Sequence, residues 1–110
     1  MSIKEKGKYI IDKESLDKIN IDFLSSSMDE NEILKTIKTV YEKFDIVLDP
    51  HSAIGYGAFD KINLRGNNVV LATAHPCKFP SAIEKAINLK AELPNELAFI
   101  LDEEENYDII

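Results

Sequence analysis

Residues 69–80, VVLATAHPCKFP, run from an apolar segment directly into a polar loop. The first part of this stretch, residues 69–71, is apolar and mostly β-branched, which is typical of a strand buried on both faces. Open α/β sheets bind ligands in the loops at the carboxyl ends of their strands. We therefore expect the loop over residues 72–80 to contact a small molecule.

A second segment repeats the same pattern. Residues 46–48, IVL, form a short apolar run, and residues 48–57, LDPHSAIGYG, continue it with a polar turn and small side chains. Two strands that each end in a polar loop predict one shared site at the edge of a sheet. The sequence therefore favours an α/β fold in which short parallel strands have flanking helices.

Helices are expected on both sides of these segments. Residues 28–44 carry apolar side chains at helical spacing, and Ser27 with Glu30 fits a capping box at the start. A second helix should run over residues 50–59, because Asp49 followed by proline fits an N-cap and a first helical position. The other expectations are weak helicity over residues 1–21, a loop over 61–68, helices over 80–87 and 94–101, and a solvated acidic tail over 102–106.

Composition narrows the class of protein. With 13 basic and 20 acidic residues the formal net charge is −7, and there is no basic patch with interleaved aromatic residues, so nucleic acid is not an expected partner. No apolar run is long enough to span a bilayer, and the charged residues 3–8 do not fit a signal peptide, so no membrane contact is expected. With a single cysteine, Cys77, the sequence predicts a reducing, cytoplasmic location.

Residues 49–55, DPHSAIG, and residues 71–79, LATAHPCKF, match two motifs of one enzyme family in order and with a similar spacing. The motifs are D-P-H-[ST]-A-x-G and L-[AG]-T-A-H-P-x-K-F, and with them the chain closely resembles the C-terminal part of threonine synthase. That family consists of pyridoxal-phosphate (PLP) enzymes of fold type II, the fold of tryptophan synthase β. The resemblance implies a lyase of threonine biosynthesis, which converts O-phospho-L-homoserine and water into L-threonine and phosphate.

The resemblance also implies which parts of the site this chain supplies. A serine or threonine at the position of Thr73 contacts the pyridine nitrogen of PLP in the family, while the Schiff-base lysine and the phosphate cradle precede these motifs. Lys78 matches a family position that is not the Schiff-base lysine, and the four glycines form no phosphate loop. We therefore expect residues 1–110 to be a C-terminal portion of the enzyme without the Schiff-base lysine region. Such a portion should bind PLP weakly by itself and self-associate through uncovered apolar surface.

Other interpretations of these residues stay open on the sequence. The Thr73 hydroxyl could bond a backbone carbonyl in a turn, and Asp49 is expected to cap a helix rather than act as an acid or base. His51 fits a loop histidine with satisfied ring nitrogens, whereas His75 could orient a phosphate, relay a proton or cap a carbonyl. Together with Cys77 these histidines could form a metal site or a cysteine–histidine pair, although Cys77 also fits a small packing residue.

Two further functions compete with that of an enzyme portion. One is a non-catalytic α/β module that binds a partner chain or a small anion, for which Lys78 offers a positive charge when it is not simply a surface lysine. The other is a small hydrolase built on His51, His75 and Cys77. The sequence leaves open whether the chain has enzymatic activity by itself.

Overall fold

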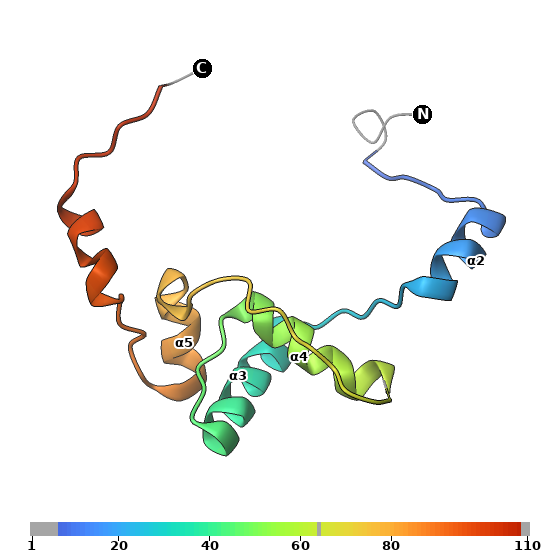
Figure 1. Cartoon of the computed structure of the whole chain (residues 1–110), viewed down its shortest axis with the longest axis horizontal. Coiled ribbons are helices and arrows are strands. Elements are labelled where there is room, and N and C mark those ends of the chain that lie inside the picture. Colours follow the sequence, from blue (N-terminus) through green and yellow to red (C-terminus); the bar gives the residue numbers. More distant parts are fainter. Residues whose placement is uncertain (1–6, 64, 109–110) are drawn as a thin grey trace.

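The computed structural model describes residues 7–63 and 65–108, and in these residues the chain is helical (Figure 1). The α-helices are α2 (Lys13–Asp22), α3 (Glu30–Phe44), α4 (Pro50–Ile62) and α5 (Pro80–Ile87), and the 3-10 helices are η1 (Pro76–Lys78) and η2 (Asn95–Asp102). Among the helices of these described residues, none has the length and apolarity that crossing a membrane requires.

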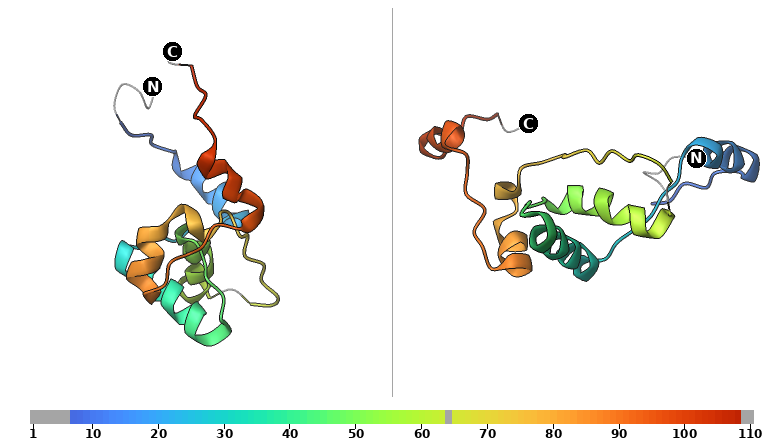
Figure 2. Two further views of the ribbon diagram at one scale, coloured as in Figure 1. Left: turned by 90° about the vertical axis from the view of Figure 1, so that its left-hand side faces the viewer. Right: turned by 60° about the horizontal axis from the view of Figure 1, so that its bottom comes forward.

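The prediction of short parallel strands is wrong. Within the described part of the chain no strand is present, and residues 69–71 form an irregular segment that runs beside α4 (Figures 1 and 2). Val69 and Leu71 are 85% and 74% exposed, whereas Val70 is partly buried against Gly55. An apolar β-branched run predicts a segment that suits a strand, but a strand also needs a second backbone to pair with. Neither this run nor residues 46–48 has one here.

Helix α3 begins two residues later than predicted. Its N-cap is Asp29, whose carboxylate accepts a hydrogen bond from the Glu32 N–H, while the Glu32 carboxylate accepts from the Asp29 N–H, both at 2.9 Å. The capping box therefore consists of Asp29 and Glu32 rather than Ser27 and Glu30. Aspartate and serine are comparable N-caps, so the cap chemistry allowed either register.

The core lies where α4 and α5 pack against α3. Ile37 from α3, Ala53 from α4 and Ile83 from α5 are all 0% exposed. In the predicted apolar stripe of α3, Ile37 and Val40 are buried, while Phe44 at its end is 48% exposed. Ala86 of α5 also belongs to this core, and the side chains packed against it are Ile33, Leu34, Val47, Leu48, Ile87 and Ala91. Each of the three helices thus contributes its apolar face to one small core.

The starts of α4 and α5 agree with the prediction. Helix α4 begins at Pro50 behind its N-cap Asp49, although it continues to Ile62 and so takes in the first residues of the predicted loop. Buried Gly57 has a packing reason, because a Cβ there would lie 2.6 Å from the sulfur of Met28. The predicted fourth helix is the 3-10 helix η2 rather than an α-helix.

The chain is less compact than a domain of its length. Its radius of gyration is 18.5 Å, against the roughly 13 Å that is usual for about a hundred residues. Helices α2 and η2 lie on opposite sides of the core and away from it (Figure 1). Helix α2 has no buried residue, and the apolar side chains of Ile21, Phe23 and Leu24 near its end are at least 63% exposed. The segments that contain α2 and η2, here called the two arms, therefore leave much of their apolar surface exposed to solvent.

Candidate functional site

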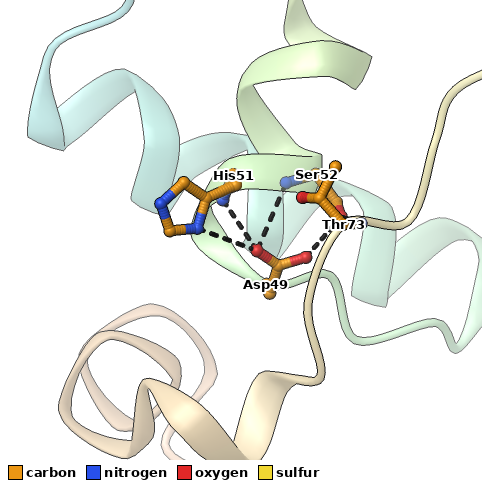
Figure 3. Close-up of polar contacts among 4 residues, drawn as sticks. All are labelled: Asp49, His51, Ser52 and Thr73. Atoms are coloured by element: carbon orange, nitrogen blue, oxygen red, sulfur yellow. Dashed lines mark hydrogen bonds and ion pairs between the residues drawn. The ribbon is translucent and has the colours of Figure 1, made fainter.

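The best-defined polar cluster lies at the N-terminus of α4 (Figure 3). The Asp49 carboxylate is buried and accepts hydrogen bonds from the backbone N–H of His51 at 2.9 Å, the backbone N–H of Ser52 at 3.4 Å and the hydroxyl of Ser52. These N–H groups have no partner inside the helix, so the carboxylate satisfies them. The predicted capping role of Asp49 is confirmed.

Ser52 connects this cap to the loop that follows residues 69–71. Its Oγ, on a side chain that is 2% exposed, accepts a hydrogen bond of 3.1 Å from the backbone N–H of Thr73. A continuous set of hydrogen bonds therefore runs from Thr73 through Ser52 to Asp49. The two motifs that define the sequence resemblance are therefore joined by a hydrogen bond, and in the described residues no strand takes part in joining them.

Sequence reasoning assigned no role to Ser52. The motif that the chain resembles has serine or threonine at this position, and both of these residues carry a hydroxyl. A hydroxyl can donate one hydrogen bond and accept others at the same time, which is what a link between a carboxylate and a backbone N–H needs.

The environment of Asp49 keeps its carboxyl group ionised. Burial acts to raise the pKa of Asp49, but the hydrogen bonds from the Ser52 side chain and from the backbone of His51 and Ser52 outweigh it, so the pKa lies below its ordinary value of 3.8. Asp49 is therefore a hydrogen-bond acceptor at neutral pH and holds no proton to donate.

Asp49→Asn is expected to lower the free energy of unfolding at neutral pH and to have less effect in acid. The pKa of Asp49 is lower in the folded chain than in the unfolded chain, where it has its ordinary value of 3.8. The ionised carboxylate therefore stabilises the folded chain above pH 3.8, and this stabilisation is lost as the pH falls through the lower pKa of the folded chain. Urea unfolding from pH ~7 to pH ~2 measures the difference between native chain and variant. Asp17→Asn on exposed α2 is the control for the loss of one negative charge. A difference that stays constant down to the lowest pH would contradict this role of Asp49.

The Thr73 side chain lies exposed on the loop, beside the first turn of α4. Its backbone is held by Ser52, while its hydroxyl has no hydrogen-bond partner in the described part of the chain. The alternative of a turn in which this hydroxyl bonds a nearby carbonyl is therefore not seen. Thr73 presents an anchored backbone with an open hydroxyl.

The two histidines lie in different surroundings. His51 is in the first turn of α4 rather than in a loop, with its side chain 61% exposed, its Nδ1 3.3 Å from Asp49 and its ring centroid 5.0 Å from that of Phe79. His75 is the N-cap of η1, and its Nδ1 accepts a 3.2 Å hydrogen bond from the Cys77 N–H. It also lines an open groove of about 560 Å³ with apolar residues of α5. Each ring thus has one polar contact within its own turn, His51 with Asp49 and His75 with Cys77.

The arrangement gives little support to a metal site or a cysteine nucleophile. No group of three potential metal ligands occurs among the described residues. Cys77 is free and partly buried, and its contact with His75 is made by the backbone N–H rather than the thiol. Lys78 is exposed at the end of η1. The cluster around Asp49, Ser52 and Thr73 is thus the candidate site.

Comparison with known proteins gives a consistent result. The family model "Threonine synthase, C-terminal" matches residues 52–110. The threonine synthase of Pseudomonas aeruginosa is 34% identical in an alignment of 112 positions that covers 99% of this chain. That of Saccharomyces cerevisiae is 33% identical in an alignment of 95 positions that covers 78% of it. The chain spans 24% and 18% of the length of these two relatives.

Solved structures agree with the sequence comparison. A PLP-bound threonine synthase from Brucella melitensis superimposes with a TM-score of 0.82 at 34% identity, over 98% of this chain and 24% of that one. A threonine synthase from yeast superimposes with a TM-score of 0.74 at 29% identity, over 94% of this chain and 23% of that one. The extended arrangement of helices described above therefore recurs inside much longer enzymes.

Proposed function

Because this chain belongs to the threonine synthase family, we propose that it acts as the C-terminal part of an enzyme that converts O-phospho-L-homoserine and water into L-threonine and phosphate. The family model over residues 52–110 and the two superimposed enzymes support this assignment. In the proposal, residues 1–110 carry the loop that faces the ring of PLP, and the Schiff-base lysine and phosphate cradle lie elsewhere in the enzyme. The single free cysteine, Cys77, fits a cytoplasmic location.

The described residues fit one contact to PLP and offer no site for its phosphate. Gly55 and Gly57 lie against Val70 and Met28, so packing explains both glycines, and neither is part of a loop of free N–H groups. The open, neutral hydroxyl of Thr73 fits a partner for a pyridine nitrogen. Bound PLP would supply an electron sink, and a neutral hydroxyl at its ring nitrogen would leave the ring a weaker sink than a carboxylate, which would keep that nitrogen protonated.

The position of Thr73 is the observation that carries this proposal. The residue is exposed, its backbone is tied to the first turn of α4, and it lies in the motif that resembles the cofactor loop of the family. The test uses the intact enzyme loaded with PLP. Thr73→Val should shift the absorption spectrum of the bound cofactor, whereas Thr73→Ser should keep the native spectrum. An unchanged spectrum in Thr73→Val would disprove the contact.

The isolated chain is expected to bind PLP weakly, without attachment to one particular lysine, and to self-associate. Its apolar arms are uncovered, and we infer that in the intact enzyme they pack against the rest of the protein. Titration with PLP followed by borohydride treatment and peptide mapping tests the first point, and sedimentation over a range of concentrations tests the second. Stable attachment at a single lysine, or a monomer at every concentration, would contradict the corresponding expectation.

A further inference from the structure

We propose that Ser52 and Asp49 are positioning residues that hold Thr73 at the angle from which its hydroxyl reaches the cofactor. This inference rests on the proposed function, since it concerns how the same site is kept in place. It adds two residues that contact neither the substrate nor the ring in the proposal. Their effect passes through the backbone of Thr73.

The need for an anchor follows from the loop itself. Residues 69–73 form an irregular segment, which contacts α4 through Val70 on Gly55 and through the hydrogen bond from Thr73 to Ser52. An apolar contact with a glycine can slide, because it has no preferred direction. The hydrogen bond fixes the Thr73 N–H in direction as well as distance. This hydrogen bond therefore fixes the position of the Thr73 backbone, from which the side chain extends.

The carboxylate of Asp49 gives this anchor its direction. Asp49 accepts a hydrogen bond from the Ser52 hydroxyl, so the lone pairs of Oγ are left free to accept from the Thr73 N–H. Asp49 is in turn held by the N–H groups of the first turn of α4. Thr73 is thus connected through two buried side chains to a rigid helix, which is the kind of support that a precise site needs.

Helix capping by itself does not account for the hydroxyl. The carboxylate of Asp49 already accepts from two backbone N–H groups, so the cap would be complete with alanine at position 52. A hydroxyl on a side chain that is 2% exposed is costly unless its hydrogen-bonding capacity is used. The Ser52 hydroxyl donates a hydrogen bond to Asp49 and accepts one from the Thr73 N–H. These two bonds form the link that the proposal requires.

The experiment compares Ser52→Ala, Ser52→Thr and Thr73→Val in the intact enzyme. Hydrogen exchange of the Thr73 amide is measured without PLP, and the absorption spectrum is measured after PLP is added. Ser52→Ala should accelerate exchange at Thr73 about tenfold, the loss expected for one hydrogen bond on an exposed loop. It should also shift the spectrum in the same direction as Thr73→Val. Ser52→Thr keeps the hydroxyl and should restore both properties.

The outcomes separate this inference from the function on which it rests. Native exchange and a native spectrum in Ser52→Ala, together with a shifted spectrum in Thr73→Val, would overturn the positioning role and leave the proposed function intact. A native spectrum in Thr73→Val would disprove the cofactor contact, while faster exchange in Ser52→Ala would still support the anchor. If Ser52→Ala does not fold, Ser52→Cys replaces it, because a thiol of similar size is a weaker hydrogen-bonding group.

Discussion

Ile37→Ala is expected to lower the free energy of unfolding of this chain by about 2–5 kcal/mol. Ile37 is 0% exposed and packs in the core that α3 shares with α4 and α5. Truncation would remove apolar contacts and leave a cavity between three helices, and a small core has few other side chains that can move to fill it. Because total stabilities of small domains are only several kcal/mol, this change should unfold much of the population.

Urea unfolding followed by circular dichroism measures this loss, at the lowest usable protein concentration because association would add stability. The matched control is Ile21→Ala on α2, where the same side chain is 79% exposed and the expected change is within about 0.5 kcal/mol. Equal effects of the two substitutions would show that the core described here does not hold the chain together.

The helices could be predicted because their signals are local. Asp49 followed by Pro50 sets the start of α4, and the spacing of Ile33, Ile37 and Val40 sets the buried face of α3. Such signals depend on neighbours one or two turns away. The register of the α3 cap was missed because Ser27 and Asp29 are both good caps, and local preference does not separate them.

The strands and the role of Ser52 could not be predicted in the same way. A strand at residues 69–71 depends on a partner that the apolar run does not specify, and in the described residues its neighbour is helix α4 instead. The hydrogen bond from Thr73 to Ser52 joins residues 21 positions apart, so it depends on how the chain folds back. The motifs indicated which two segments share a function, and the folded chain shows that the Thr73 N–H and the Ser52 Oγ join them.

Thr73→Val is expected to lower turnover in the intact enzyme by the equivalent of about 1–3 kcal/mol of transition-state free energy. Valine keeps the shape of the side chain and its backbone N–H, so the anchor to Ser52 stays. What is lost is the hydroxyl, so under the proposed function the ring nitrogen loses its hydrogen-bond partner. Steady-state kinetics with O-phospho-L-homoserine measures the change.

Cys77→Ala is the matched control for damage to the same loop. The thiol is partly buried, and the contact of Cys77 with His75 is made by a backbone N–H that alanine retains. Turnover in Cys77→Ala should therefore stay close to the native value. Loss of activity in Cys77→Ala with native activity in Thr73→Val would reverse both assignments and restore the cysteine–histidine interpretation.

The central claim, that the Thr73 hydroxyl is the partner of the ring nitrogen, is tested most directly at that nitrogen. Nitrogen NMR of the intact enzyme, loaded with PLP that is isotope-labelled at the ring nitrogen, reports whether a hydrogen bond is made there. We expect the resonance to move in Thr73→Val and to stay at its native position in Cys77→Ala and Thr73→Ser. An identical resonance in the native enzyme and in Thr73→Val would contradict the account.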